Sequence, residues 1–282
     1  MLTLENDQLR VEILEPGKDH YSLGPRFCSG AYIWQIHHRD RGPLMTGPHW
    51  PSEEPFISDG QGIPDVFQPT LHPADTPDGE PVLVPGVGWI HWHKHVTERR
   101  KPESLIEAAQ WDWHIDGNRF ESRTRQQGHG KRFSLQRNIQ LNSTNLQIET
   151  EIRNTGLEPL HIRMFAHPFF PVPGPDGFCA MLPDGCSLPQ NPGYELDGNR
   201  LLRKSGHDWK EGHFDWIYWP ENKPFEILQK LPKGHMNVIA NFVPSTVAVW
   251  SNHCTFSIEP FIEKVIPTGE LLEYTIRYEV EG

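Results

Sequence analysis

The 282-residue sequence contains only four cysteines, and none of them forms a Cys-x-x-Cys pair. Four are too few for a disulfide scaffold of this size, so we expect reduced, packed thiols. Positive charge is also scarce, because 26 Lys and Arg stand against 37 Asp and Glu, a net charge of −11. Nucleic acids and anionic membranes bind clustered positive charge. The composition therefore disfavours both as partners and favours a neutral or cationic small molecule.

Long hydrophobic runs are missing as well. No stretch is long and apolar enough to span a bilayer, and Met1 to Gln8 lack the basic and apolar regions of a signal peptide. We therefore expect a soluble, cytoplasmic protein. Convincing 3.6-residue periodicity is scarce too, which disfavours a helical fold. The sequence leaves the oligomeric state open.

The sequence is rich in short runs whose apolar residues alternate, separated by some of its 27 prolines and 24 glycines. Residues 9–13, 146–152 and 272–280 show this period of two, which is typical of strands. Residues 133–141 and 146–153, with polar turn residues between them, predict a hairpin. No composition break resembles a linker. We therefore expect one all-β domain over residues 1–282 with long functional loops, including the Pro-, Gly- and Asp-rich stretch 45–86.

Two motifs place a titratable residue on a predicted strand. The run 160–166 leads into His167-Pro-Phe-Phe170, and its alternation puts His167 on the polar face. In residues 255–259 the apolar residues Phe256 and Ile258 share one face and Glu259 lies on the other. A histidine and a glutamate on separate strands can move two protons at once on a small polar substrate. Alternation alone favours a simpler interpretation, two solvated residues on the outer side of a sheet.

These motifs resemble those of the aldose 1-epimerase (galactose mutarotase) superfamily. Asn154-Thr-Gly156 followed by His167-Pro-Phe-Phe170 is similar to the family's catalytic-acid segment, Ile258-Glu-Pro260 to its catalytic-base strand, and Pro267-Thr-Gly-Glu270 to its Pro-Gly-Glu turn. The resemblance covers the C-terminal half well and the N-terminal half loosely. It implies a large antiparallel β-sandwich, the galactose mutarotase-like supersandwich, with His167 and Glu259 as catalytic residues, a small-molecule sugar as substrate, and neither metal nor organic cofactor.

The resemblance also implies a mechanism and a place in carbohydrate metabolism. Ionised Glu259 would take the proton of the anomeric hydroxyl while protonated His167 gives one to the ring oxygen. The ring opens to an aldehyde, rotates about C1–C2 and recloses as the other anomer. Each positioned proton transfer contributes about a hundred- to ten-thousand-fold. The expected function is thus an isomerase that interconverts the anomers of a hexose or hexose derivative.

The N-terminal half departs from the hexose-6-phosphate epimerase branch of this superfamily. Gly60 or Gln61 stands where that branch has an arginine, Val87 replaces its second sugar-binding histidine, and His91 replaces a later arginine. Losing two cationic positions weakens recognition of a phosphate, which uses bidentate donors. The candidate substrate-binding residues are Arg26, Gln61, His91 and Asp215, the last by similarity to the family's substrate-binding acid.

Two alternatives stay open. His91-Trp-His93 with Glu98 imitates the first half of a cupin metal motif, and imidazole and carboxylate groups can bind a metal. The glycine spacing before His91 is off by one and no second motif follows, so we expect no metal there. Absence of the second sugar-binding histidine is also what drift to a non-catalytic carbohydrate-binding or sugar-sensing protein would look like. Convergence of His167 and Glu259 on one cavity would favour the enzyme.

Overall fold

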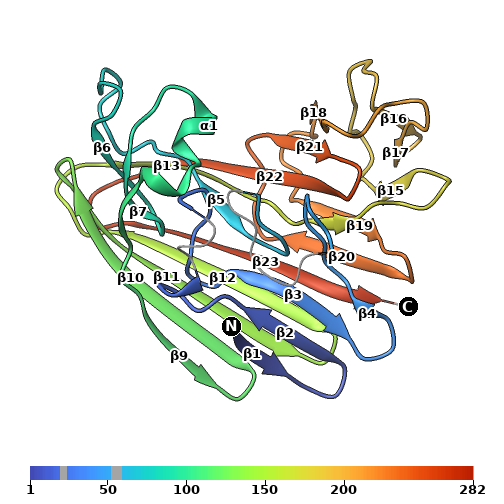
Figure 1. Cartoon of the computed structure of the whole chain (residues 1–282), viewed down its shortest axis with the longest axis horizontal. Coiled ribbons are helices and arrows are strands. Elements are labelled where there is room, and N and C mark those ends of the chain that lie inside the picture. Colours follow the sequence, from blue (N-terminus) through green and yellow to red (C-terminus); the bar gives the residue numbers. More distant parts are fainter. Residues whose placement is uncertain (20–23, 52–58, 282) are drawn as a thin grey trace.

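A computed structural model describes residues 1–19, 24–51 and 59–281, and strands dominate it (Figure 1). The largest sheet has ten strands in the order β16 (Tyr194–Asp197), β17 (Arg200–Arg203), β15 (Phe178–Met181), β19 (Glu226–Lys230), β20 (His235–Ala240), β23 (Leu271–Glu281), β12 (Asn145–Asn154), β11 (Lys131–Asn142), β10 (Arg119–Gly128) and β9 (Asp112–Asp116). A six-stranded sheet has the order β18 (His213–Ile217), β21 (Val247–Ser251), β22 (Thr255–Ile266), β13 (Leu160–Ala166) and β5 (Asp65–Phe67), with β14 (Phe170–Pro171) also paired to β22.

Two smaller sheets and very little helix complete the described part of the chain. The four-stranded sheet contains β1 (Leu2–Glu5), β2 (Leu9–Ile13), β3 (Ile33–His38) and β4 (Gly42–Pro43), and the three-stranded sheet contains β6 (Pro81–Val84), β7 (Gly88–His91) and β8 (Leu105–Ala108). The helical segments are α1 (Val96–Arg99) and the 3-10 turn η2 (Pro102–Ser104). Of the predicted loop 45–86, residues 52–58 lie outside the described ranges. No helix in the described residues is long and apolar enough to cross a membrane.

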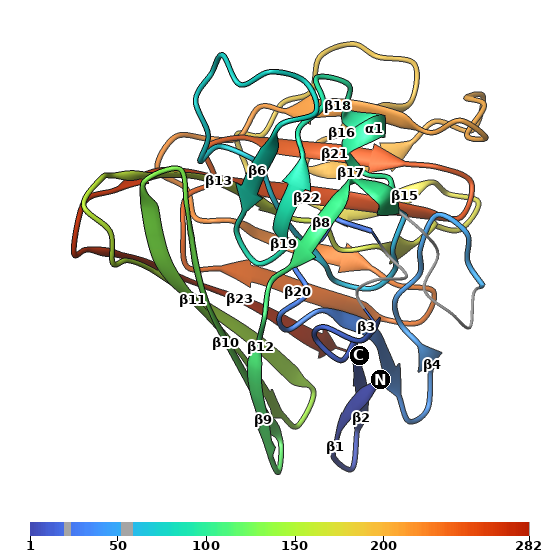
Figure 2. The same ribbon diagram turned by 60° about the vertical axis from the view of Figure 1, so that its left-hand side comes forward.

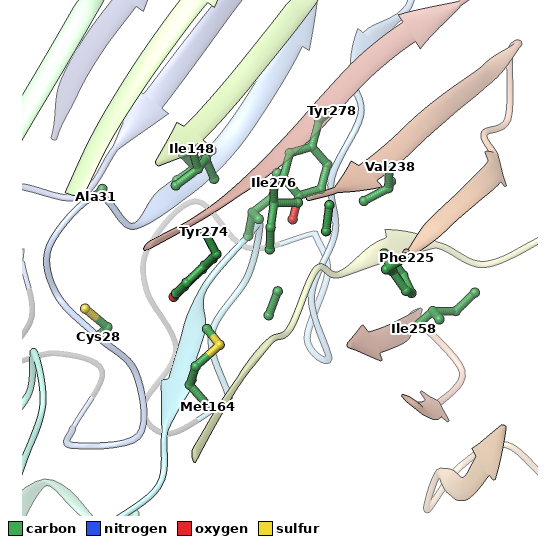
Figure 3. Close-up of a cluster of buried hydrophobic side chains, with 14 of the residues drawn as sticks. Cys28, Ala31, Ile148, Met164, Phe225, Val238, Ile258, Tyr274, Ile276 and Tyr278 are labelled. Carbon is green, nitrogen blue, oxygen red and sulfur yellow. The ribbon is translucent and has the colours of Figure 1, made fainter. Parts of the chain in front are cut away.

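The ten-stranded and six-stranded sheets lie face to face, as the two views of the ribbon show (Figure 1; Figure 2). Alternate residues of both sheets point into the space between them and form the main hydrophobic core. Figure 3 shows part of it, with Met164 of β13 across from Ile148 of β12 and Ile276 of β23. Neighbouring strands pair antiparallel. The predicted all-β class and large antiparallel β-sandwich are therefore confirmed, while the single domain over 1–282 stays a prediction.

The predicted hairpin is formed by β11 and β12. Asn142 pairs with Asn145, which leaves a two-residue loop, and Ser143 takes a φ of 51°. A two-residue hairpin loop needs positive φ to match the twist of its strands. The polar turn residues therefore identified the loop correctly. Arg137 lies on β11 in the ten-stranded sheet, and its side chain contacts a residue of the six-stranded sheet.

A buried ion pair joins the two large sheets. Arg137 of β11 donates to the carboxylate of Asp65 on β5, and both side chains are almost fully buried. Arg137 Nη1 also donates to the Gly30 carbonyl at 2.9 Å. The backbone N–H of Cys28 donates to the Asp65 carbonyl at 2.9 Å. The ion pair therefore fixes the segment 24–34 relative to both sheets.

The segment 24–34 covers the outer face of the six-stranded sheet. Its Phe27, Tyr32 and Trp34 form a second apolar cluster that also contains Phe165 of β13 and Phe261 of β22. These residues are 8% exposed or less. An antiparallel sheet commonly leaves one face to water, but here this face is buried as well, and the candidate site lies beneath the cover.

Candidate active site

His167 and Glu259 lie opposite each other on neighbouring strands. In the β13–β22 ladder Phe165 pairs with Phe261, and in the β14–β22 ladder Phe170 pairs with Phe256. One register runs through both ladders, so it places His167 across from Glu259, where side chains of a pair meet on one face. The Nε2 atom of His167 is 3.3 Å from Oε1 of Glu259. The structure thus brings together the two residues predicted to be catalytic.

Both side chains are buried, with 2% of His167 and 4% of Glu259 exposed. The interpretation of two solvated residues on an outer sheet face is therefore wrong. The physical reason is the cover formed by the segment 24–34, which places Phe27 edge-on to the imidazole at 6.3 Å between ring centroids. Phe169 stacks on the imidazole at 4.3 Å, and Trp250 lies edge-on at 6.0 Å.

Arg26 joins the pair from the covering segment. Its Nη2 lies 3.1 Å from Nε2 of His167. A guanidinium can only donate, so Nε2 accepts this hydrogen bond and the neutral imidazole carries its proton on Nδ1. Nδ1 is buried without a hydrogen-bond partner among the described residues. Burial, followed by repulsion from Arg100, lowers the pKa of Arg26 to about 9, so the guanidinium remains charged at neutral pH.

The electrostatic environment shifts the acid and the base in opposite directions. Burial, followed by the positive charges of Arg26 and Arg100, holds the pKa of His167 well below its ordinary value. Burial raises the pKa of Glu259 to about 7, although Arg26 and Arg100 both lower it. Near neutral pH the ligand-free site therefore has a neutral imidazole and a carboxyl group that is about half protonated. This state differs from the expected starting state of protonated His167 and ionised Glu259, because desolvation disfavours both charged forms.

Gln61 contacts the segment 24–34 that covers the site. It is 2% exposed, and its Nε2 donates to the Trp34 carbonyl at 3.4 Å. Its backbone N–H donates to the hydroxyl of Tyr32 at 3.1 Å. These bonds hold residue 61 against the covering segment, and a direct role in sugar binding stays a prediction.

Asp215 and His91 are not brought to the pair. Asp215 pairs with Val249, which pairs with Ile258, so Asp215 lies on the core side of the sheet, opposite to the face that carries Glu259. Its carboxylate accepts from the Trp216 backbone N–H at 2.8 Å. His91 ends β7 in the three-stranded sheet, is exposed, and bonds to the Gly79 carbonyl through Nδ1 at 2.9 Å. The resemblance on which both residues were chosen does not show which strand faces meet in the fold, and a substrate-binding role for Asp215 and His91 stays a prediction.

Solved structures with the same architecture identify the fold. The chain superposes on a galactose mutarotase related enzyme from Lactobacillus acidophilus with a TM-score of 0.64 at 14% identity, covering 100% of this chain and 97% of that one. The proposed aldose 1-epimerase of Escherichia coli K12 gives 0.65 at 14%, covering 99% and 98%. A galactose mutarotase-like protein from Lactobacillus casei gives 0.63 at 13%, covering 100% of both chains. The chain has the galactose mutarotase-like fold. No family model matches the sequence, and no curated protein matches it either.

Within this mutarotase-like fold, sequence analysis missed Arg100. It follows α1, and its charge lowers the pKa of both His167 and Glu259. Arg26, Arg99 and Arg100 line a cavity of about 60 Å³ next to the site. The only signal in the sequence was the charged run Glu98-Arg-Arg-Lys101, which is far more often a solvated surface.

The residues of the cupin alternative bond to separate partners in this fold. His93 Nδ1 lies 3.3 Å from Asp78 Oδ2, and Glu98 accepts from Lys101 at 2.7 Å. His91 bonds to Gly79, as described above. Within the described ranges no three His, Cys, Asp or Glu side chains gather as they would around a metal ion. Nothing in this geometry favours the cupin alternative.

Proposed function

We propose that the chain is an aldose 1-epimerase-like isomerase that interconverts the anomers of a hexose or hexose derivative at His167 and Glu259. The observation that carries the proposal is the 3.3 Å separation between the imidazole Nε2 and the carboxylate Oε1 on one covered sheet face. Acid-base catalysis needs both groups within hydrogen-bond reach of one substrate. The mutarotase-like fold of the solved neighbours supports the same reaction class by analogy only.

The proposed mechanism starts with one proton on the pair, held by Glu259. The neutral imidazole of His167 accepts the proton of the anomeric hydroxyl while the carboxyl group of Glu259 donates one to the ring oxygen. The bond between C1 and the ring oxygen breaks, and the open-chain aldehyde rotates about C1–C2. Return of both protons recloses the ring as the other anomer and restores the starting state. The pKa of about 7 for Glu259 suits a group that donates and accepts near neutral pH.

Arg26 has a positioning role in this mechanism. Its hydrogen bond to Nε2 fixes the imidazole plane next to Glu259, and its charge lowers the pKa of both groups. A sugar hydroxyl that enters beside the pair competes with Arg26 for Nε2. Because Arg26 remains charged, it can turn to a substrate oxygen as a charge-assisted donor.

Sugar binding without turnover is the second candidate function. The observation that favours it is the same Arg26 contact, because Nε2 is occupied in the ligand-free protein. Under this alternative the pair would bind a sugar through hydrogen bonds and leave its anomers at their spontaneous rate of exchange.

One-dimensional saturation-transfer NMR on a panel of aldoses distinguishes the two. The enzyme accelerates exchange between the α and β signals of at least one aldose, whereas a binder does not. Glu259→Gln keeps the shape of the side chain but cannot exchange a proton in this way, so the exchange rate should fall by at least about a hundredfold. The matched control is Glu263→Gln, on the same strand and face but 43% exposed and bonded to His161. Equal rates for the two variants would contradict the proposed role of Glu259.

A further inference from the structure

Three aromatic side chains project from the edge of the six-stranded sheet. Phe214 is 45% exposed, Trp216 40% and Tyr218 63%. They occupy alternate positions along and just after β18, so they share one face. β18 is the outer strand of this sheet, next to β21 (Figure 1; Figure 2). We call Phe214, Trp216 and Tyr218 the aromatic ledge.

The ledge lies on the same sheet face as the catalytic pair. Trp216 pairs with Ala248, and Ala248 pairs with Glu259. Two strand spacings of about 4.8 Å separate the backbones of Trp216 and Glu259, about 10 Å in all. The rings also form a continuous series, because Trp216 lies 5.6 Å from Phe261, which stacks on Phe165 at 4.4 Å. Phe165 in turn lies 5.9 Å from the imidazole of His167.

A groove opens beside the ledge. It has a volume of about 630 Å³, and its lining includes Trp216, Tyr218, Trp219 and the loop 243–246. Glu221, Asn222, Ser245 and Thr246 add polar groups to its lining. The volume is within the usual range for sites that bind small molecules. Broad aromatic faces with a few polar groups suit a ligand that is apolar on its ring faces and polar around its rim.

A sugar ring has that chemistry, since its C–H faces stack on aromatic rings while its hydroxyls bond to the rim. Only the reducing-end unit of an oligosaccharide has a free anomeric hydroxyl, so only that unit can react at the pair. We propose that the protein binds a neutral oligosaccharide whose reducing-end unit lies at His167 and Glu259, and that the aromatic ledge and its groove bind the sugar units linked to that unit. This rests on the proposed function. The net charge of −11 and Glu221 in the groove favour a neutral chain over an anionic one.

The test is calorimetric titration with two series of probes, glucose to maltotetraose and glucose to cellotetraose. In at least one series Kd should fall by at least about tenfold from the monosaccharide to the trisaccharide, equivalent to about 1.4 kcal/mol. Trp216→Ala should reduce that ratio to about one, and Trp216→Phe, which keeps an aromatic face, should retain part of it. The matched control is Trp113→Ala on β9, because Trp113 is 39% exposed and lies on an edge strand of the other large sheet. The control should keep the full ratio.

Several outcomes would overturn the proposal. One is equal affinity for all chain lengths in both series, and another is an equal loss in the Trp113 and Trp216 variants. A third is sedimentation showing a dimer that Trp216→Ala converts to monomer, with no response to oligosaccharide, because the ledge would then be a contact between copies. Binding is measured without turnover, so the two proposals can fail separately. If affinity depends on chain length but anomer exchange is not accelerated, oligosaccharide binding at the ledge is supported and the proposed function is refuted. If exchange is accelerated but affinity does not depend on chain length, only oligosaccharide binding at the ledge is refuted.

Discussion

The rate of the proposed reaction should fall as the pH rises above 7. The mechanism needs one proton on the pair, and the structure assigns it to Glu259, whose pKa burial raises to about 7. His167 does not supply a replacement, because its pKa lies well below the ordinary value. The reactive fraction is therefore the protonated fraction of Glu259, about 90% at pH 6, about half at pH 7 and about one tenth at pH 8, for a pKa of about 7. Above pH 8 the rate should fall about tenfold for each further unit.

The assay is anomer exchange by saturation-transfer NMR from pH 5.5 to 9, with the spontaneous rate measured and subtracted at each pH. The enzymatic rate should be nearly constant below pH 6 and decline through pH 7 with a single ionisation. The alternative starting state, ionised Glu259 with protonated His167, gives a different profile. At ordinary pKa values it would give a maximum between about pH 4.3 and 6.5. A rate that rises through pH 7, or one with that acidic maximum, would refute the protonation state derived from burial.

Two further predictions concern the surroundings of the pair. Arg26→Gln should move the alkaline limb of the pH–rate profile to higher pH, because Arg26 lowers the pKa of Glu259. The same NMR assay measures this shift. If the limb does not move, Arg26 does not act on the pKa of Glu259. Dialysis against EDTA should leave the exchange rate unchanged, because every proposed proton transfer uses a protein side chain; loss of activity that zinc, manganese or nickel restores would contradict the proton-transfer mechanism.

Sequence patterns predicted strands and faces well because both are local properties. Alternation separated Glu259 from Ile258 correctly, and Ile258 is in the main core. The polar residues between 141 and 146 marked a real hairpin loop. The motif around His167 and the motif around Glu259 predicted a pair that the register of β22 with its neighbours does form.

Contacts between distant segments could not be predicted in the same way. Burial of the pair depends on the segment 24–34, which is more than 130 residues from His167 in the sequence and carries no periodic pattern that would show it as a cover. The face on which Asp215 lies could not be predicted, because it depends on the register of β18 with β21. Arg100, which is half-buried, was missed because a charged run in a sequence does not reveal which of its members lies near a buried acid-base pair.

Burial is what gives the pair its chemistry, and the cover in turn depends on the link between Arg137 and Asp65. Glu259 and His167 would have ordinary pKa values on an open sheet face, where the carboxyl is ionised at pH 7 and the imidazole is mostly neutral, so the pair would hold no proton to donate. Desolvation under the segment 24–34 raises the pKa of Glu259 to about 7, so that about half of the Glu259 carboxyl groups keep their proton at pH 7. The cover is held in place because Arg137 binds both Gly30 of the segment 24–34 and Asp65 of β5. Next to Asp65, the Pro64 carbonyl accepts a hydrogen bond from the His167 backbone N–H at 2.8 Å. The interior of the sandwich therefore sets the position of both Arg26 and His167, and through them the acid-base state of the candidate active site.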